Sequence, residues 1–435
     1  MEAKDIIITP LLIILIFAVI YIFKAKISNE ILRKYFFLGL IVKILGALSI
    51  GFLYQFYYEG GDTFAYHTHG SRHIWEAFMD SPIAGLKLLF ADGVHYPDTY
   101  SYSSKIWYYK DPSAYNIVRI SAIFDLLTFS TYSATAVLFS IATFSGIWAL
   151  FLTFYKICPK LHFQLALAIL FMPSVFLWGS GILKDSVTLC SLGWATYAVH
   201  KAFFLRRHVI RNLIVFLIAC CLIFAIKKYI LLTFLPAVII WIFTYKMVKI
   251  HNLVLKILIT PFILLISAMI AYFAITKIGD DDPRYAVENL AETAKTTAYD
   301  IAYWTGRDAG STYELGELDG TFLGLLKLGP KAINTALFRP YLWEIKSPLM
   351  ILSSMEALIS LSLTIYLIFA TRVIGLKLIF NNPTIIFCLA FSLVFAFAVG
   401  VSTFNFGTLS RYKIPMIPYY FTGMAFIYYH FKNRK

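Results

Sequence analysis

The chain has 435 residues, of which 60% are hydrophobic and 14% are charged, and its mean hydropathy is +0.73. This composition excludes a water-soluble globular protein and predicts an all-α polytopic membrane protein, with residues 1–435 forming a single membrane domain. The net charge of +14 does not indicate a nucleic-acid partner, because no nucleic-acid motif is present and about half of the Lys and Arg residues lie in connections beside anionic membrane lipids.

Apolar windows long enough to cross a hydrocarbon core of roughly 30 Å predict about eleven transmembrane helices. They lie at 7–24, 35–57, 131–155, 163–180, 184–200, 211–227, 229–247, 253–276, 348–370, 383–404 and 414–431. Glu2 and Asp5 precede the first window, and it lacks an Ala-x-Ala-like cleavage site, so we expect a retained helix and not a signal peptide. Four of the five cysteines fall within these windows, so we expect no external disulfide.

The short connections between the windows predict the orientation of the chain. Positive charge near the ends of spans is held on the cytoplasmic side, whereas long loops translocate largely regardless of charge. Six segments are basic and carry one acidic residue among them, so we place them inside: KAKISNEILRKY, YKICPKLH, HKAFFLRRHVIRN, YKMVKIHNLVLK, TRVIGLKLIFNN and the C-terminal KNRK. The N-terminus then lies outside, as do two long loops at 58–130 and 277–347, which hold 8 and 11 of the 24 acidic residues.

Both long extracytoplasmic loops are predicted to contain interfacial helices. Apolar residues recur at helical spacing in the first loop, on either side of a proline break, and we expect these residues at the membrane surface: Ile74, Phe78, Leu86 and Leu89. The second loop predicts helices near 284–304 and 319–338, with a kink at Pro330.

The stretch YYEGGDTFAYHTHGSRHIW, residues 57–75, gathers titratable side chains where the chain leaves the bilayer. Gly60 and Gly61 end the second span, and Asp62 is suited to cap a helix that runs from Thr63 to about Phe78. Spacings of four, three and four residues place a carboxylate, a phenol and two imidazoles on one face of that helix: Asp62, Tyr66, His69 and His73.

This stripe permits three interpretations. Asp62, with Glu59 beside it, can act as a general base on a hydroxyl group just outside the bilayer. Asp62, His69 and His73 can alternatively supply three ligands to Zn²⁺ or a similar ion. In the simplest interpretation Asp62 is only a helix cap and the histidines are interface residues. His67 points away from the stripe and takes no part in any of these schemes.

A second group of candidate residues lies in FMPSVFLWGSGILKDS, residues 171–186. Pro173, Gly179 and Gly181 interrupt the apolar pattern and place Lys184 and Asp185 at the start of the next span. Non-helical backbone at this depth is tolerated only where it is buried in protein or lines a wet cavity. Lys184 is therefore either a snorkelling anchor or, paired with Asp185, a contact for phosphate or substrate.

Further basic residues occur at the other outer turns, where the positive-inside bias would not place them. With Lys184 they can ring an external cavity that neutralises a phosphate or pyrophosphate: Lys227, Lys228, Arg339, Arg411 and Lys413. In the alternative each pairs with a loop acid, and Glu344 is the obvious partner for Arg339. Glu356 falls inside a predicted span, where a carboxylate is costly, so it is either a site residue or a buried partner of a basic residue.

The long first outer loop, the segment GGDTFAYH and the outer basic residues together resemble the membrane-embedded glycosyltransferases of the GT-C superfamily, over about the first two hundred residues. The segments LFRPYLWE and NFGTLSRYKIPMIPYY are similar to those of uncharacterised bacterial membrane proteins from polysaccharide loci, including polymerase-like ones. In many GT-C members the catalytic loop follows the first span and carries paired acids, whereas here it follows the second and Asp62 stands with Glu59.

The resemblance implies a glycosyltransferase of the bacterial inner membrane that makes surface polysaccharide or glycoconjugates. Its donor would be a polyprenyl-(pyro)phosphate-linked sugar at the extracytoplasmic face, and its acceptor a glycan or glycolipid. Asp62 would take the place of the catalytic carboxylate, and the basic residues would stabilise the departing lipid phosphate. A transporter or flippase of lipid-linked sugars is the alternative, although no inverted repeat is visible, and an accessory subunit is a third possibility.

Overall fold

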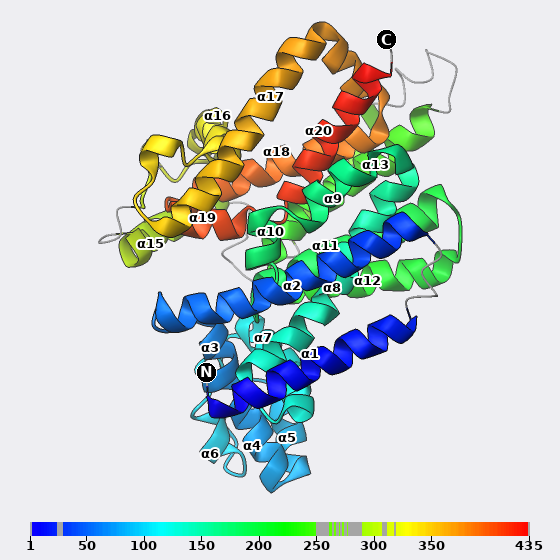
Figure 1. The fold of residues 1–435 in the computed structure, drawn as a ribbon. Coiled ribbons are helices and arrows are strands. Elements are labelled where there is room, and N and C mark those ends of the chain that lie inside the picture. Colours follow the sequence, from blue (N-terminus) through cyan, green and yellow to red (C-terminus); the bar gives the residue numbers. More distant parts are fainter. Residues whose placement is uncertain are drawn as a thin grey trace. The chain divides into compact units, whose positions relative to one another are not determined.

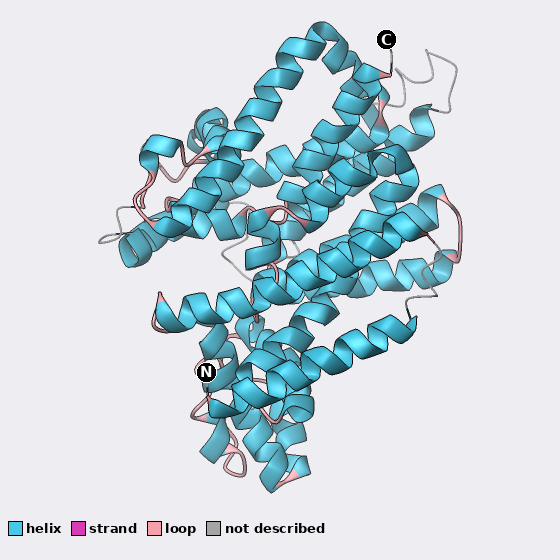
Figure 2. Ribbon diagram, viewed as in Figure 1, coloured by secondary structure: helices cyan, strands magenta, loops and turns pink. Residues whose placement is uncertain are grey.

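The computed structural model describes residues 2–23, 29–248, 289–306, 311–316 and 319–433, together with isolated positions between 261 and 276. Over these residues the regular secondary structure is helical (Figures 1 and 2). The described residues contain no strand, only one isolated antiparallel bridge between Thr312 and Asn405. The predicted all-α class is confirmed.

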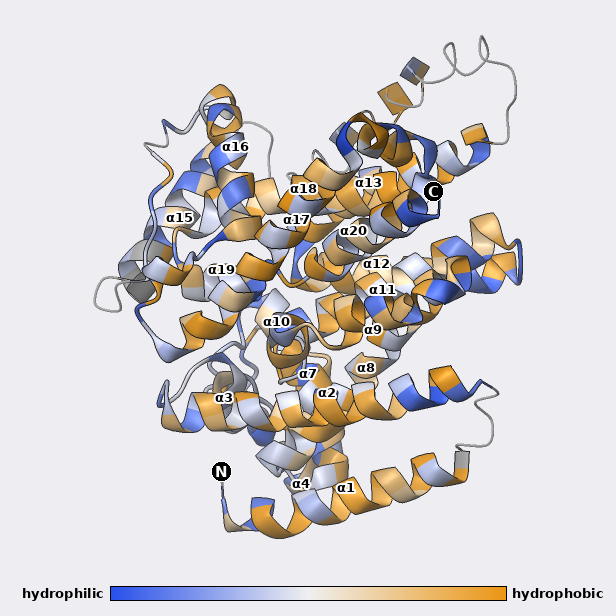
Figure 3. Ribbon diagram, turned by 45° about the horizontal axis from the view of Figure 1, so that its top comes forward, coloured by the Kyte–Doolittle hydropathy of each residue, from blue (hydrophilic) through white to orange (hydrophobic). Residues whose placement is uncertain are grey.

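Seven of the described helices are long and apolar enough to cross a membrane. They are α1 (Ala3–Phe23), α2 (Glu30–Phe56), α8 (Tyr132–Ile157), α12 (Val209–Ile226), α13 (Lys228–Val248), α17 (Pro348–Asn381) and α18 (Pro383–Thr403). Figure 3 shows that α1 and α2 are hydrophobic over most of their length. In α1 only 11% of the most apolar window is buried inside the protein, as expected for a helix that faces lipid.

Three further predicted spans correspond to shorter helices. These are α9 (His162–Leu170) with α10 (Pro173–Trp178), then α11 (Lys184–Val199) and α20 (Ile417–Lys432). Pro173 begins α10 because a proline lacks the N–H that would continue α9, so the window at 163–180 is not one helix. The window at 253–276 lies outside the continuously described residues, and the total of eleven spans stays a prediction.

The chain folds into two compact units, each built from segments that are distant in sequence. The first unit comprises Met1–Leu150, Val175–Trp194 and Ile218–Lys227. The second unit comprises Phe151–Ser174, Ala195–Leu217 and Lys228–Lys435. This division into units does not test whether residues 1–435 form a single membrane domain, which stays a prediction.

In the first unit the loop 58–130 folds into a series of short helices. They are α3 (Asp62–Tyr66), the π-helical turn η2 (His67–Ser71), α4 (Arg72–Asp80), α5 (Pro82–Leu89), α6 (Tyr100–Ser103) and α7 (Pro112–Thr128). The prediction of one uninterrupted α-helix to about Phe78 was wrong, because η2 interrupts it and His69 has non-helical backbone angles of −100° and 20°. A π-turn holds an extra residue, so side chains beyond it rotate out of the expected stripe.

The expected membrane-facing stripe in this loop is only partly exposed. Ile74 is fully buried, and the ring of Phe78 packs against Gly85 of α5. Leu86 is exposed, in company with Ile83 on the same short helix. The prediction was therefore wrong for Ile74, because packing of α4 against its neighbours in the unit buries that face of the helix.

Helix α2 packs closely against the backbone between α10 and α11. A side chain at Gly46 would collide with the carbonyl of Phe176, and one at Gly181 would lie 2.6 Å from a methyl carbon of Ile50. Glycine at both positions therefore permits a closer approach than a residue with a Cβ atom would allow. This contact holds the broken segment directly against a membrane-spanning helix.

In the second unit, α18 is the central helix and packs against α13, α16 and α20 (Figure 1). The two helices predicted in the second loop correspond to α15 (Leu290–Gly306) and α16 (Phe322–Phe338). Helix α16 continues through Pro330, and its Ala332 carbonyl lies against Gly400 of α18. A short helix, α19 (Phe406–Tyr412), precedes α20.

Candidate functional site

Asp62 lies at the point where the chain reverses after α2. Gly60 and Gly61 have positive φ angles of 143° and 116°, and Gly61 is the N-cap of α3. The prediction that Asp62 caps the helix was therefore wrong: Asp62 is the first helical residue, and no side chain caps α3. A carboxylate in a first helical turn is favoured by the partial positive charge of that end.

One tyrosine contacts the Asp62 carboxylate, and a second tyrosine packs against the first. The Tyr108 hydroxyl donates a hydrogen bond to Asp62 Oδ1 at 3.3 Å. The ring of Tyr66 lies 5.2 Å from that of Tyr108, at an angle of 36°. Asp62 is half-buried, so its carboxylate is held by Tyr108 while part of it remains accessible. Glu59, its predicted companion, is exposed at the end of α2.

The two histidines of the predicted stripe take separate partners. The His69 ring stacks on Trp107, with centroids 4.0 Å apart and planes 5° from parallel. His73 Nδ1 lies 2.9 Å from a carboxylate oxygen of Glu76. Burial, with the nearby charges of His73 and Arg72, lowers the pKa of His69 and favours its neutral ring. No group of three His, Cys, Asp or Glu side chains that could hold a metal occurs among the described residues, and the metal interpretation stays a prediction.

Lys184, at the start of α11, is brought to the first loop by the fold. Its ammonium donates to Ser113 Oγ at 2.7 Å and lies 3.5 Å from Asp111 Oδ2. The carboxylate of Asp62 is within electrostatic range of the same ammonium. The fold thus places Asp62 and Lys184, which are distant in sequence, within electrostatic range of each other in the first unit.

Asp111 both caps a helix and faces Lys184. Its Oδ1 accepts hydrogen bonds from the N–H groups of Ser113 (2.9 Å) and Ala114 (3.2 Å), so it caps α7, and its Oδ2 faces Lys184. Burial alone would raise the pKa of Asp111, but the Lys184 ammonium and these hydrogen bonds outweigh it and lower the pKa. Asp111 was not among the predicted site residues, although an Asp before Pro is a recognisable helix-start signal.

Asp185 and Lys227 form a buried ion pair beside this group. The Asp185 carboxylate is fully buried and the Lys227 ammonium nearly so, and each neutralises the other. We call the whole assembly the Asp62 cluster: Asp62, Tyr108, Asp111, Lys184, Asp185 and Lys227. Its three carboxylates and two ammonium groups give a net charge of −1. Each of the two cations faces a carboxylate: Lys184 faces Asp111, and Lys227 pairs with Asp185.

The glycine-rich interruption before Lys184 is buried in protein. This is one of the two environments that the sequence analysis allowed for non-helical backbone, the other being a wet cavity. Residues 179–183 are all buried, and the ammonium of Lys43 in α2 donates a hydrogen bond to the Gly179 carbonyl. Lys43 is itself nearly inaccessible inside a membrane-spanning helix. It satisfies a carbonyl that the interrupted helix leaves open, so it positions the segment that carries Lys184.

The remaining predicted residues belong to the second unit. Arg339 forms a bidentate ion pair with Glu344, with Nε 3.1 Å from each carboxylate oxygen, which is the alternative that the sequence left open. Burial alone would raise the pKa of Glu344, but Arg339 and the Tyr341 N–H outweigh it and lower the pKa. The Arg339 guanidinium also lies 5.1 Å from the centre of the Phe406 ring.

Glu356 is also engaged within the second unit. It accepts hydrogen bonds from the N–H and the hydroxyl of Ser174, at 3.0 and 2.8 Å, and lies within electrostatic range of the buried Lys413. Lys228 begins α13, and Arg411 lies in α19. A single cavity ringed by all the basic residues would draw on both units and stays a prediction.

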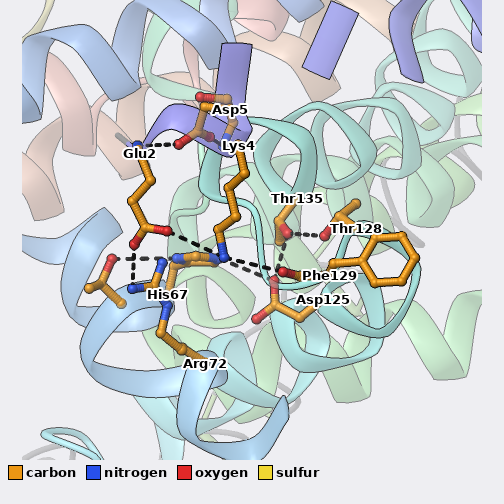
Figure 4. Close-up of polar contacts among 11 residues, drawn as sticks. Glu2, Lys4, Asp5, His67, Arg72, Asp125, Thr128, Phe129 and Thr135 are labelled. Atoms are coloured by element: carbon orange, nitrogen blue, oxygen red, sulfur yellow. Dashed lines mark hydrogen bonds and ion pairs between the residues drawn. The ribbon is translucent and has the colours of Figure 1, made fainter. Parts of the chain in front are cut away.

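His67 and Asp125 form a buried polar group that the sequence analysis did not predict. His67, expected to be a bystander, is fully buried, and its Nε2 lies 3.2 Å from Asp125 Oδ1 (Figure 4). The Thr135 hydroxyl donates to the same oxygen at 2.6 Å, and it shares a hydrogen bond with Thr128. The lone Asp125 in the apolar run of α7 was the available signal, because a buried carboxylate requires a partner.

The residues at the start of α1 make polar contacts close to this group (Figure 4). Glu2 lies 2.6 Å from Arg72, and Lys4 donates to the Phe129 carbonyl at 3.3 Å. Asp5 accepts a hydrogen bond from the Ser133 N–H at 2.8 Å. These polar contacts hold the start of a helix whose apolar surface is otherwise mostly exposed.

Comparison with known proteins gives no further identification: no family model, no curated protein and no solved structure matches the chain.

Proposed function

We propose that the protein is a membrane-embedded glycosyltransferase that takes a sugar from a polyprenyl-(pyro)phosphate carrier at the extracytoplasmic face of the bacterial inner membrane. The observation that supports this proposal best is the half-buried Asp62 carboxylate, held by Tyr108 within electrostatic range of Lys184. The acceptor is a glycan or glycolipid, and the topology is N-terminus outside and C-terminus cytoplasmic.

The proposed reaction uses two groups of the Asp62 cluster. Asp62 takes the proton of an acceptor hydroxyl while the hydroxyl oxygen bonds to the anomeric carbon of the sugar. The bond from that carbon to the lipid phosphate breaks, and the electron pair leaves with the phosphate. Lys184, whose ammonium group is held in position by Asp111 and Ser113, stabilises the negative charge of the leaving phosphate. Exposed aromatic rings of the loop, such as Trp107, offer surfaces for sugar faces.

The test is turnover by the purified protein in liposomes that contain a polyprenyl-linked donor, with the product followed by mass spectrometry. Asp62→Asn keeps the size of the side chain and should lower transfer by roughly 10²–10⁴-fold, the usual contribution of a general base. Asp98→Asn is the matched control, because Asp98 is an exposed carboxylate of the same loop that pairs with Lys87 outside the cluster. Unchanged turnover in the Asp62→Asn variant would remove Asp62 from the mechanism.

The same assay tests the metal interpretation of the stripe. If Asp62, His69 and His73 hold an ion, a chelator should abolish turnover, and His69→Ala and His73→Ala should be as damaging as Asp62→Asn. If Asp62 acts alone as the base, both histidine variants should retain most of the activity. His69 stacks on Trp107 and His73 contacts Glu76, so we expect the second result.

A transporter or flippase of lipid-linked sugars is the second candidate, and one observation favours it. The interruption between α10 and α11, with the buried Lys43 on its Gly179 carbonyl, is the kind of broken helix that transporters use at substrate sites. The liposome assay separates the two functions: a transporter moves lipid-linked sugar across the bilayer and forms no new glycosidic bond.

A further inference from the structure

At the end of α8, two lysine ammonium groups share one aromatic ring. Lys156 lies in the last turn of α8 and Lys201 in the π-helical turn η4 (His200–Phe204). Their ammonium groups lie 5.9 and 5.4 Å from the centre of the Tyr197 ring, within cation–π range. Each ammonium group also lies within electrostatic range of the other. All three residues belong to the second unit.

No carboxylate of the described residues forms an ion pair with this group of cations. Arg207 follows closely, since its N–H donates to the Lys201 carbonyl at 3.0 Å and its guanidinium is within electrostatic range of Lys156. Among the ion pairs of the described residues, none joins Lys156, Lys201 or Arg207 to a carboxylate. Like charges this close repel each other. An anion placed between them would attract every cation, and this attraction would outweigh the repulsion.

His200 provides an independent observation at the same place. It is only 6% exposed, and its Nδ1 has no hydrogen-bond partner in the part of the chain that the structure describes. It lies within electrostatic range of both lysines. Buried polar atoms are normally satisfied, so an orphan nitrogen beside two ammonium groups that no described carboxylate neutralises indicates that a ligand belongs there. The π-turn that holds His200 and Lys201 is a rare conformation found mostly at functional sites.

We propose that Lys156, His200, Lys201 and Arg207 bind one phosphate group. With Tyr197 they form what we call the Lys156 cluster. Two ammonium groups and a guanidinium can surround a phosphate, and the guanidinium can hold two of its oxygens at once. The site is separate from the Asp62 cluster and does not depend on the proposed transferase activity.

The surroundings favour the headgroup of an anionic phospholipid as the source of this phosphate. Helix α12 begins at Val209, two residues after Arg207, and its first turns expose apolar side chains, among them Ile210 (77% exposed) and Leu217 (63%). An acyl chain can lie along this surface while the headgroup meets the lysines. A soluble phosphate compound would contact the same cations but would make no apolar contact with α12.

The test is calorimetric titration of the full-length protein in a zwitterionic detergent with three probes: short-chain phosphatidic acid, short-chain phosphatidylcholine and inorganic phosphate. Phosphatidic acid should bind and phosphatidylcholine should not, because the choline charge opposes the cations. The double variant Lys156→Gln/Lys201→Gln should weaken phosphatidic acid binding by about tenfold or more, the effect of losing charge-assisted hydrogen bonds. Lys156→Arg/Lys201→Arg should retain binding.

The matched control is Lys160→Gln, which removes the same charge from an exposed lysine just beyond α8. It should leave the affinity nearly unchanged, since Lys160 is not one of the residues of the Lys156 cluster. If inorganic phosphate binds as tightly as phosphatidic acid, the site is retained and its source is a soluble compound. The proposal is overturned if neither phosphate-containing probe binds, or if the double Gln variant binds phosphatidic acid as well as the wild type does.

Discussion

The Asp62 cluster and the Lys156 cluster are both built from ionisable side chains, yet they differ in how their charges are balanced. In the Asp62 cluster, Lys184 faces Asp111 and Lys227 pairs with Asp185. In the Lys156 cluster, Lys156 and the other cations have no described carboxylate partner. A balanced cluster is a stable part of the fold that can offer one polarised group to a substrate. An unbalanced cluster is complete only when an anion is bound.

This difference predicts opposite responses to removal of a single lysine charge. In a balanced cluster, loss of one cation strands a carboxylate, so the fold should be destabilised. In an unbalanced cluster, loss of one cation relieves repulsion, so the fold should be unaffected or slightly stabilised. Three substitutions test the comparison, from the largest expected effect to the smallest.

Lys227→Met should have the largest effect. It leaves the fully buried Asp185 carboxylate without its ion-pair partner, which should lower the free energy of unfolding by about 3–5 kcal/mol. Unfolding in mixed micelles, followed by tryptophan fluorescence, measures this change. The double variant Lys227→Met/Asp185→Asn removes both charges and should recover much of the loss. Equal instability of the single and double variants would show that the pair is not what stabilises this region.

Asp111→Asn should have a smaller effect that depends on pH. Asparagine still caps α7, so only the attraction to Lys184 is lost, about 0.5–1 kcal/mol for a partly exposed pair. Because the pKa of Asp111 is lowered in the folded protein, its charge contributes stability above its ordinary pKa of about 4 and loses it as the pH falls below that value.

The stability difference between wild type and Asp111→Asn should therefore be present at pH 7 and disappear in acid. Thermal unfolding in detergent at several pH values measures it, and Asp111→Ala should add about 1 kcal/mol for the lost cap. A difference that grew on acidification would contradict the assignment of Asp111 as the charged partner of Lys184.

Lys156→Gln should have the smallest effect and the opposite sign. Removal of one of two neighbouring ammonium groups should leave the free energy of unfolding unchanged or raise it by up to about 0.5 kcal/mol, without added lipid. The same unfolding assay measures it, with Lys160→Gln as the control. A loss of more than about 1 kcal/mol would mean that Lys156 has a stabilising partner, and the contrast between the two clusters would not hold.

The sequence by itself determined the class of the protein and many of its local features. The apolar windows predicted the long helices because hydropathy is summed over neighbouring residues and needs no tertiary information. Pro173 and the glycines after it predicted the interruption before Lys184, since these residues act on their own backbone. The partnership of Arg339 with Glu344, five residues away, was also within reach of local reasoning.

Other features were decided only by the tertiary structure. The partners Lys184 and Asp111 are 73 residues apart, so their meeting depends on how separate helices pack. The π-turn η2 interrupts the predicted helix at His69, and an extra residue in a helical turn leaves no mark in the apolar periodicity.

Lys156 and Lys227 show the division most clearly. Both are lysines at the end of an apolar window, and no acidic residue in the neighbouring sequence identifies a partner for either. Lys156 lies beside another ammonium group near a tyrosine ring, and Lys227 pairs with a buried carboxylate. Composition determines how many charges a chain carries, but only packing determines which of them are neutralised, because Coulomb attraction and desolvation act over a few ångströms in space and not along the sequence.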